Sequence, residues 1–182
     1  MKYVVSVLVF LGLTISFNLL LAQKQWQVQT SSVTFKIKNA GLTVDGKFGT
    51  LQAVILFDTN DLEKASIEAS IETKTINTGI GGRDSHLRKP DYFDVEKYPK
   101  ISMKSQKISK LASGNYEGIF NLTIKGNTKE VKIPFSYKEN GNAATFAGEF
   151  ALNRLDYKVG SSSWLMSDNV TIKISLSVTS NQ

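Results

Sequence analysis

Apolar and polar residues alternate along most of the chain after residue 25, as in β-strands with one buried and one solvent-facing side. In the first such stretch, Val33, Phe35 and Ile37 alternate with Thr34 and Lys36. Eight segments of this kind follow one another, at residues 26–38, 47–58, 65–72, 101–104, 116–124, 131–137, 146–152 and 170–178. The pattern therefore predicts an all-β protein with eight strands.

Short connections between these segments predict antiparallel neighbours. Residues 113–115, 125–127 and 140–142 each combine a glycine with asparagine, which is typical of tight hairpin turns. Parallel pairing would need long, usually helical crossovers, and the sequence offers none. Eight antiparallel strands with one apolar face form either a sandwich or a closed barrel, and the barrel leaves no exposed edge.

The residues assigned to the inner side are large and apolar, and none of them is charged. Five phenylalanines lead this set: Phe35, Phe57, Phe120, Phe135 and Phe150. An eight-stranded barrel is either filled by its side chains or wide enough for one small ligand. The alternation alone is compatible with both a packed core and an apolar tunnel for a long apolar molecule.

One predicted strand, at residues 47–58, is apolar on both sides, because Val54 and Leu56 face away from Ala53 and Ile55. A bulge in this strand would reverse its register. Its second apolar side is also a candidate surface for a homodimer.

Composition sets the class of protein. The 182 residues are 41% hydrophobic and 21% charged, which suits one globular domain with a substantial core. The net charge of +6 is spread along the strands, which favours transient contact with an anionic membrane surface and predicts no nucleic-acid partner. The absence of cysteine excludes disulfides and thiolate metal sites.

The N-terminus has the layout of a secretory signal peptide. Lys2 precedes an apolar run at residues 3–21, and small Ala22 is followed at once by polar residues. The alternative is a membrane anchor, since about 20 apolar residues can span a bilayer. We expect cleavage after residue 22, a mature domain at residues 23–182, and a periplasmic or secreted protein.

Residues 83–99, RDSHLRKPDYFDVEKYP, interrupt the strand pattern between the third and fourth predicted strands. This segment holds the only histidine, two of the three arginines and two of the three prolines. Asp84 or Ser85 is expected to cap a short helix, which Pro90 then interrupts. The segment is therefore predicted to form a short helical lid over one end of the barrel.

Two roles suit this lid. In the first, Arg83 and Arg88 grip the polar head of a ligand while Tyr92 and Phe93 provide apolar cover. In the second, the same residues have a purely structural role and close the end of the barrel without contacting a ligand. His86 adds a third alternative, a small secreted enzyme that uses it as an acid or base. A lone histidine without a triad or metal-site pattern predicts neither catalytic nor metal-binding residues.

Residues 83–105 resemble the signature of the YceI-like family of exported lipid-binding proteins, which runs R-D-x-H-L and then F-F-D-x-x-x-Y-P. Residues 122–126 and 153–157 also match. Two positions depart from the pattern. Asn39 stands where the family often has histidine, which makes a head-group contact there doubtful, and Tyr92 replaces the first phenylalanine of the F-F-D motif.

The resemblance implies a lipocalin-like, eight-stranded antiparallel barrel around a tunnel for a polyisoprenoid chain. The function then expected is a non-catalytic exported carrier of a polyprenyl phosphate or isoprenoid quinone, with no cofactor besides this lipid. A ligand-free structural module is the remaining alternative. The expected ligand-binding residues are the tunnel set Phe35, Phe57, Phe120, Phe135 and Phe150, and the mouth set Arg83, His86, Arg88, Tyr92 and Phe93.

Overall fold

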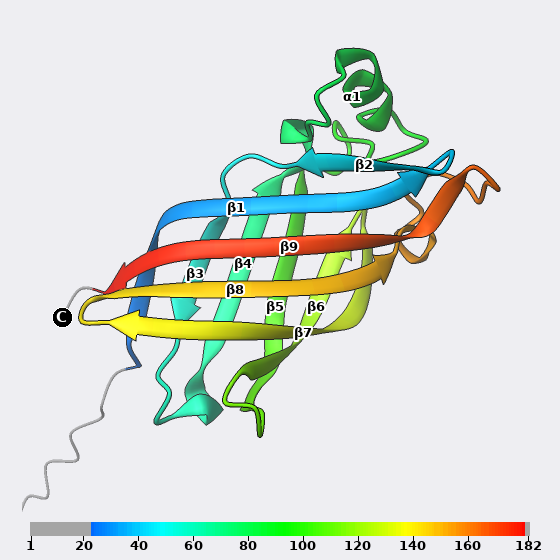
Figure 1. The fold of residues 1–182 in the computed structure, drawn as a ribbon. Helices are drawn as coiled ribbons and strands as arrows, with labels where there is room; N and C mark the ends of the chain where they lie inside the picture. Colours follow the sequence, from blue (N-terminus) through cyan, green and yellow to red (C-terminus); the bar gives the residue numbers. More distant parts are fainter. Residues whose placement is uncertain (1–22, 181–182) are drawn as a thin grey trace, which may run out of the picture.

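The structure is a computed structural model that describes residues 23–180, so the predicted signal peptide lies outside the described residues. Nine strands make up most of it (Figure 1). They are β1 (Gln25–Asn39), β2 (Leu42–Lys47), β3 (Gln52–Leu56), β4 (Ser66–Glu72), β5 (Lys100–Lys110), β6 (Tyr116–Ile124), β7 (Asn127–Asn140), β8 (Ala143–Asn153) and β9 (Met166–Ser180). The helical elements are α1 (Gly81–Leu87) and the 3₁₀ turns η1 (Leu62–Lys64), η2 (Thr73–Thr75) and η3 (Arg154–Tyr157). Within this range no helix is long and apolar enough to span a membrane.

The strands form one antiparallel sheet that closes on itself through β1 and β9. These two strands pair from Trp26 opposite Ser180 to Asn39 opposite Met166. On its other side, β1 pairs with β3 near its start and with β2 near its end. Because β2 and β3 share one position around the barrel, nine strands fill eight positions. The predicted eight-stranded antiparallel barrel is confirmed.

The second predicted strand, residues 47–58, is in fact divided. Only its first residue belongs to β2, which begins earlier than expected, and its later part forms β3. Between them the chain leaves the ladder and passes close to η2, where the Gly49 N–H donates to Thr75 Oγ1 at 2.9 Å. A Cβ atom on Gly49 would lie 3.0 Å from that of Thr75, so this approach favours glycine.

A bulge in β1 explains why its apolar residues change parity. Trp26 and Val28 face the core from even positions, whereas Val33 and Ile37 do so from odd ones. The pairing with β9 shifts by one residue between Val28 and Thr30, which turns the following side chains to the other face. A second shift in β5 has the same effect. Both long strands therefore keep an apolar inner side from end to end.

The predicted helical lid is confirmed as α1, between β4 and β5, but it begins earlier than expected. Its first residue is Gly81, after Ile80, so neither Asp84 nor Ser85 caps it. The Asp84 carboxylate accepts instead from the Thr78 N–H at 2.8 Å. The aspartate thus fixes the loop before the helix rather than the helix end.

Aromatic side chains fill the barrel end where β1 begins, away from α1. At their centre Phe57 is fully buried, with its ring centroid 4.8 Å from Tyr137 and 5.2 Å from Tyr116. The Trp26 indole N–H donates to the Phe57 carbonyl at 2.9 Å. We call the group the aromatic plug, and its members are Trp26, Phe57, Tyr116, Phe135, Tyr137 and Phe146. This half of the barrel is a packed core.

We expect the Phe57→Ala substitution to lower the free energy of unfolding by about 3–5 kcal/mol, because the plug cannot collapse into the space of a lost ring. Phe48→Ala is the matched control, since Phe48 is only partly buried. Its loss should be clearly smaller. Urea denaturation of both variants measures the difference, and equal losses would show that the plug is not the better-packed region.

Candidate functional site: an apolar cavity under the lid

The half of the barrel nearer α1 contains a cavity of about 180 Å³ with an almost wholly apolar lining. A buried water needs only about 10–15 Å³, and an apolar cavity of about 150 Å³ stays dry and binds small apolar molecules. The space is therefore more than a packing defect. Its apolar walls come mainly from β1, β4, β5, β8 and β9, and include Val33, Ala69, Ile71, Ile101, Met103, Leu152, Val170, Ile172 and Ile174.

The structure separates the predicted tunnel phenylalanines into two groups. Phe35 and Phe150 line the cavity, whereas Phe57 and Phe135 belong to the aromatic plug. Phe120 is buried in the core, outside the lining. The hydrophobic alternation placed all five inside the barrel, but it could not tell the filled half from the hollow half.

The predicted mouth residues are divided in the same way. Arg83, Tyr92 and Phe93 contribute to the cavity lining, and His86 and Arg88 do not. His86 is exposed, and its ring forms a T-shaped contact with Tyr92 at a centroid distance of 5.0 Å. The role of each residue in ligand binding stays a prediction.

Arg83 reaches the cavity while two of its nitrogens are held by Thr78. Its Nε donates to Thr78 Oγ1 at 2.7 Å, and its Nη2 donates to the Thr78 carbonyl at 2.8 Å. Asp84 binds the same residue from the other side through the Thr78 N–H and hydroxyl. The arginine is consequently oriented by backbone and hydroxyl groups, and its positive charge lies at the edge of an apolar space.

These hydrogen bonds also change the acidity of Asp84. The bond from the Thr78 hydroxyl, with smaller contributions from its N–H and from the charges of Arg88 and Arg83, holds the pKa of Asp84 below the ordinary value of 3.8. The carboxylate is favoured because every one of these groups interacts better with the charged form. Burial acts in the opposite direction and is outweighed.

Arg88 has a structural position. Its Nε donates to the Lys74 carbonyl at 2.8 Å and its Nη2 to the Ile76 carbonyl at 2.9 Å. Both acceptors lie in the segment that leads from β4 to α1, so the guanidinium ties the end of α1 to that segment. In this arrangement Arg88 connects the lid to the segment before it, and it is not among the residues that line the cavity.

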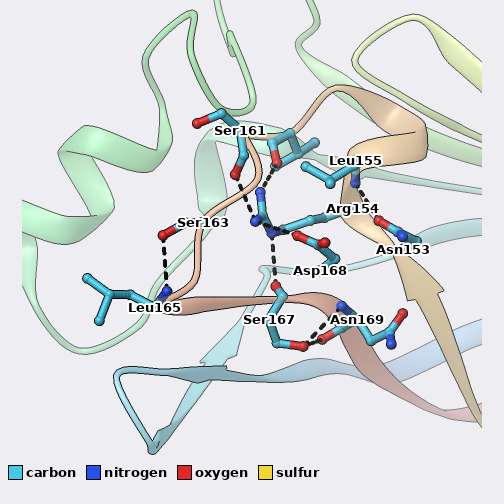
Figure 2. A network of polar contacts seen from close by, with 10 residues as sticks. Asn153, Arg154, Leu155, Ser161, Ser163, Leu165, Ser167, Asp168 and Asn169 are labelled. Atoms are coloured by element: carbon cyan, nitrogen blue, oxygen red, sulfur yellow. Dashed lines mark hydrogen bonds and ion pairs between the residues drawn. The ribbon is translucent and has the colours of Figure 1, made fainter.

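Arg154, at the start of η3, is a cavity-lining residue that the sequence analysis did not single out as a site residue. Its side chain is only 4% exposed. Figure 2 shows the guanidinium at the centre of a polar network, with Nε donating to Ser167 O at 3.0 Å and Nη1 to Val159 O at 2.9 Å. Nη2 donates to Ser161 O and to Asp168 Oδ1, both at 2.9 Å. One side chain thus satisfies three carbonyls, two in the loop before β9 and one, that of Ser167, near the start of β9.

The same segment is joined to the lid. The Gly160 N–H donates to the Asp91 carbonyl at 2.9 Å. A Cβ atom on Gly160 would lie 2.9 Å from both Arg154 Nη1 and the Tyr92 ring, and the φ of +70° also favours glycine. Arg154, Tyr92 and Gly160 therefore pack together where the lid meets the loop before β9.

One signal in the sequence pointed to Arg154. Only three of the 22 basic residues are arginines, and Arg154 is the one outside the lid segment. Arginine, unlike lysine, offers a planar fork of donors that can satisfy several carbonyls at once. Its partners at residues 159–168 follow no periodic pattern, so the network itself could not be predicted.

The fold and the cavity define a single-domain antiparallel barrel that is packed at one end and hollow at the other. The chain belongs to the YceI-like family, because the model of the YceI-like domain matches residues 25–178. The family predicted from residues 83–105 is confirmed.

Relatives in both sequence and structure agree with this assignment. The UPF0312 protein VPA0850 from Vibrio parahaemolyticus is 27% identical over 145 residues, which cover 74% of this chain and 77% of that protein. The crystal structure of BcnA from Burkholderia cenocepacia superimposes with a TM-score of 0.78 and 27% identity, covering 82% of this chain and 96% of BcnA. A polyisoprenoid binding domain from Saccharophagus degradans has a TM-score of 0.66 and covers 87% of this chain and 100% of that domain, but at 14% identity it shows the shared fold alone.

We expect Arg154→Met to lower the free energy of unfolding by about 3–5 kcal/mol, because three carbonyls and a carboxylate lose a buried charged partner. Asp168→Asn is the matched control. It removes only the ion pair to a partly exposed carboxylate, so its cost should be about 1 kcal/mol or less. Chemical denaturation measures both, and a larger loss in the control would mean that the ion pair, not the carbonyl bonds, carries the stability.

The lowered pKa of Asp84 predicts how stability depends on acid. A carboxylate whose pKa is lower in the folded state stabilises the fold fully above its unfolded value of 3.8. This contribution is lost as the pH falls through the folded pKa. Thermal unfolding of the Asp84→Asn variant should therefore vary less steeply with pH in this acid range than that of the wild type. If the unfolding temperature of the variant depends on pH as steeply as that of the wild type, Asp84 does not contribute to acid sensitivity.

Proposed function

We propose that this protein is a non-catalytic, exported carrier that holds an isoprenoid lipid, a polyprenyl phosphate or an isoprenoid quinone, in the cavity beneath α1. The observation that carries the proposal is the apolar cavity of about 180 Å³ with Arg83 and Arg154 on its lining. Export is inferred from the layout of residues 1–22, and the periplasm or the secreted fraction is the location that fits it.

The lining suits a chain of methyl and methylene groups. Burial of apolar ligand surface contributes about 25 cal/mol per Å² removed from water, and aliphatic walls offer no polar group that would lose hydrogen bonds. The aromatic plug occupies the far half of the barrel. A bound chain therefore enters from the lid end and stops against packed side chains.

The two arginines support a polar or anionic head group at the lid end. All three nitrogens of Arg154 already donate to protein oxygens. Arg83 donates through Nε and Nη2 to Thr78, and its Nη1 has no hydrogen-bond partner among residues 23–180. Arg83 is therefore the better candidate to bind a phosphate or quinone oxygen, while Arg154 adds positive charge to the same cavity.

A carrier suits the placement of His86 better than an enzyme does. The imidazole is exposed on the lid and packs against Tyr92, while the cavity lining is formed by other residues of the segment. An acid or base must come within hydrogen-bond distance of the reacting group. His86 does not reach the space in which the proposed ligand lies.

Organic extraction of protein purified from its native host, followed by mass spectrometry, tests the proposal. We expect a near-stoichiometric isoprenoid lipid from the wild type and a strongly reduced amount from Ala69→Phe, because Ala69 lines the cavity and the added ring fills it. Ala151→Phe, on the exposed side of β8, is the matched control and should retain the lipid.

One further measurement and one further variant complete this test. Circular dichroism confirms that each variant folds, and Val170→Phe fills the cavity from β9 in case the first variant does not fold. Repeatedly empty wild-type protein would overturn the carrier proposal. A lipid retained equally by both cavity variants would place the ligand elsewhere.

A further inference from the structure

Three apolar side chains are unusually exposed at the barrel end beside the cavity. Trp164 is 92% exposed, Leu42 is 72% exposed and Leu165 is 44% exposed. Leu42 begins β2 just after a tight turn, and the other two lie in the loop before β9. We call these three residues the apolar tip. Nearly all other large apolar residues in the described part of the chain are buried or half-buried, so this grouping requires an explanation.

The turn and the loop that carry the apolar tip lie side by side. Asn39, the last residue of β1, pairs with Leu42 on one side and with Met166 on the other. The Ala40 N–H also donates to the Leu165 carbonyl at 2.7 Å. Figure 1 shows the β1–β2 turn and the loop before β9 projecting together at the same end of the barrel as α1.

The apolar tip lies next to residues that line the cavity. Asn39, Val44 and Met166 line the cavity, and each lies within two residues of the tip, in sequence or by strand pairing. Met166, which follows Leu165 in the sequence, thus brings the cavity lining next to the exposed tip. A ligand leaving or entering at this end would pass along these residues.

We propose that the apolar tip docks on a phospholipid surface, from which the barrel takes up its ligand or to which it returns it. This inference rests on the proposed function, because a lipid carrier has to meet the membrane that contains its cargo. Tryptophan is enriched at membrane interfaces, and leucine inserts readily into the acyl region. The tip projects from loops at the end of the barrel, which suits shallow insertion better than a flat protein interface.

Charge near the tip agrees with an anionic lipid surface. Lys38, opposite Thr43 in the same hairpin, is exposed and forms no ion pair with another residue of the range 23–180. The net charge is +6 for the whole chain and +5 for residues 23–182, because Lys2 is the one charged residue before them. Exposed lysines beside inserted apolar residues add electrostatic attraction to anionic head groups.

Co-flotation with vesicles tests the docking surface directly. The probe is a vesicle of phosphatidylcholine and phosphatidylglycerol without any isoprenoid. We expect the wild type to float with the vesicles and the Trp164→Ala/Leu165→Ala variant to bind about tenfold more weakly, because two inserted side chains are lost. Val54→Ala is the matched control, since Val54 is exposed on β3, which lies near the opposite end of β1 from the tip.

The two tryptophans provide a second, independent measurement. Trp26 is only 1% exposed in the aromatic plug, whereas Trp164 is almost fully exposed. Vesicles with brominated acyl chains should quench the emission of Trp164 and shift the remaining spectrum of the wild type towards that of buried Trp26. Wild-type protein that neither floats nor is quenched would overturn the docking surface, and so would unchanged binding of the double variant.

The outcomes separate this inference from the proposed function. Protein that yields an isoprenoid on extraction but does not bind vesicles would leave the carrier in place and point to a protein partner at the tip. If the protein binds vesicles through the tip but yields no isoprenoid, the docking surface is supported and the proposed isoprenoid ligand is wrong.

Discussion

Closure of the barrel between β1 and β9 is the constraint on which the rest of the structure depends. A sheet of this length with one apolar side would otherwise expose two edges and much of its inner face. The long pairing from Trp26 to Asn39 removes both problems, and the bulge after Val28 keeps the inner side apolar throughout. Because the same strand reaches both ends, it starts in the aromatic plug and finishes beside the cavity and the apolar tip.

The contrast between the two barrel ends follows from the size of the side chains. The plug end collects six aromatic rings that pack against one another in edge-to-face, tilted and stacked contacts and fill this end of the barrel. Near α1 the inner positions carry mainly aliphatic residues, and a polar lid closes over them. Because the plug end is filled by side chains, an apolar ligand could fit only at the end near α1.

At the lid end, hydrogen bonds from arginine side chains hold the loops in place where strand pairing ends. Arg88 and Arg154 donate to five backbone carbonyls between them, and Arg83 donates to Thr78. Four of these five carbonyls lie outside the strands, so strand pairing does not satisfy them. Two of these guanidinium groups, those of Arg83 and Arg154, also line the cavity, so the residues that order the loops bring positive charge to its edge.

The sequence by itself determined the barrel, the antiparallel order, the lid and the family, because alternation, turn residues and the motif at residues 83–105 are local signals. It could not divide residues 47–58 between β2 and β3, since the break depends on the close approach of Gly49 to Thr75. Only the tertiary structure decided that Phe35 borders a cavity while Phe57 fills a plug. Both residues alternate in the same way, and what distinguishes them is which side chains face them across the barrel.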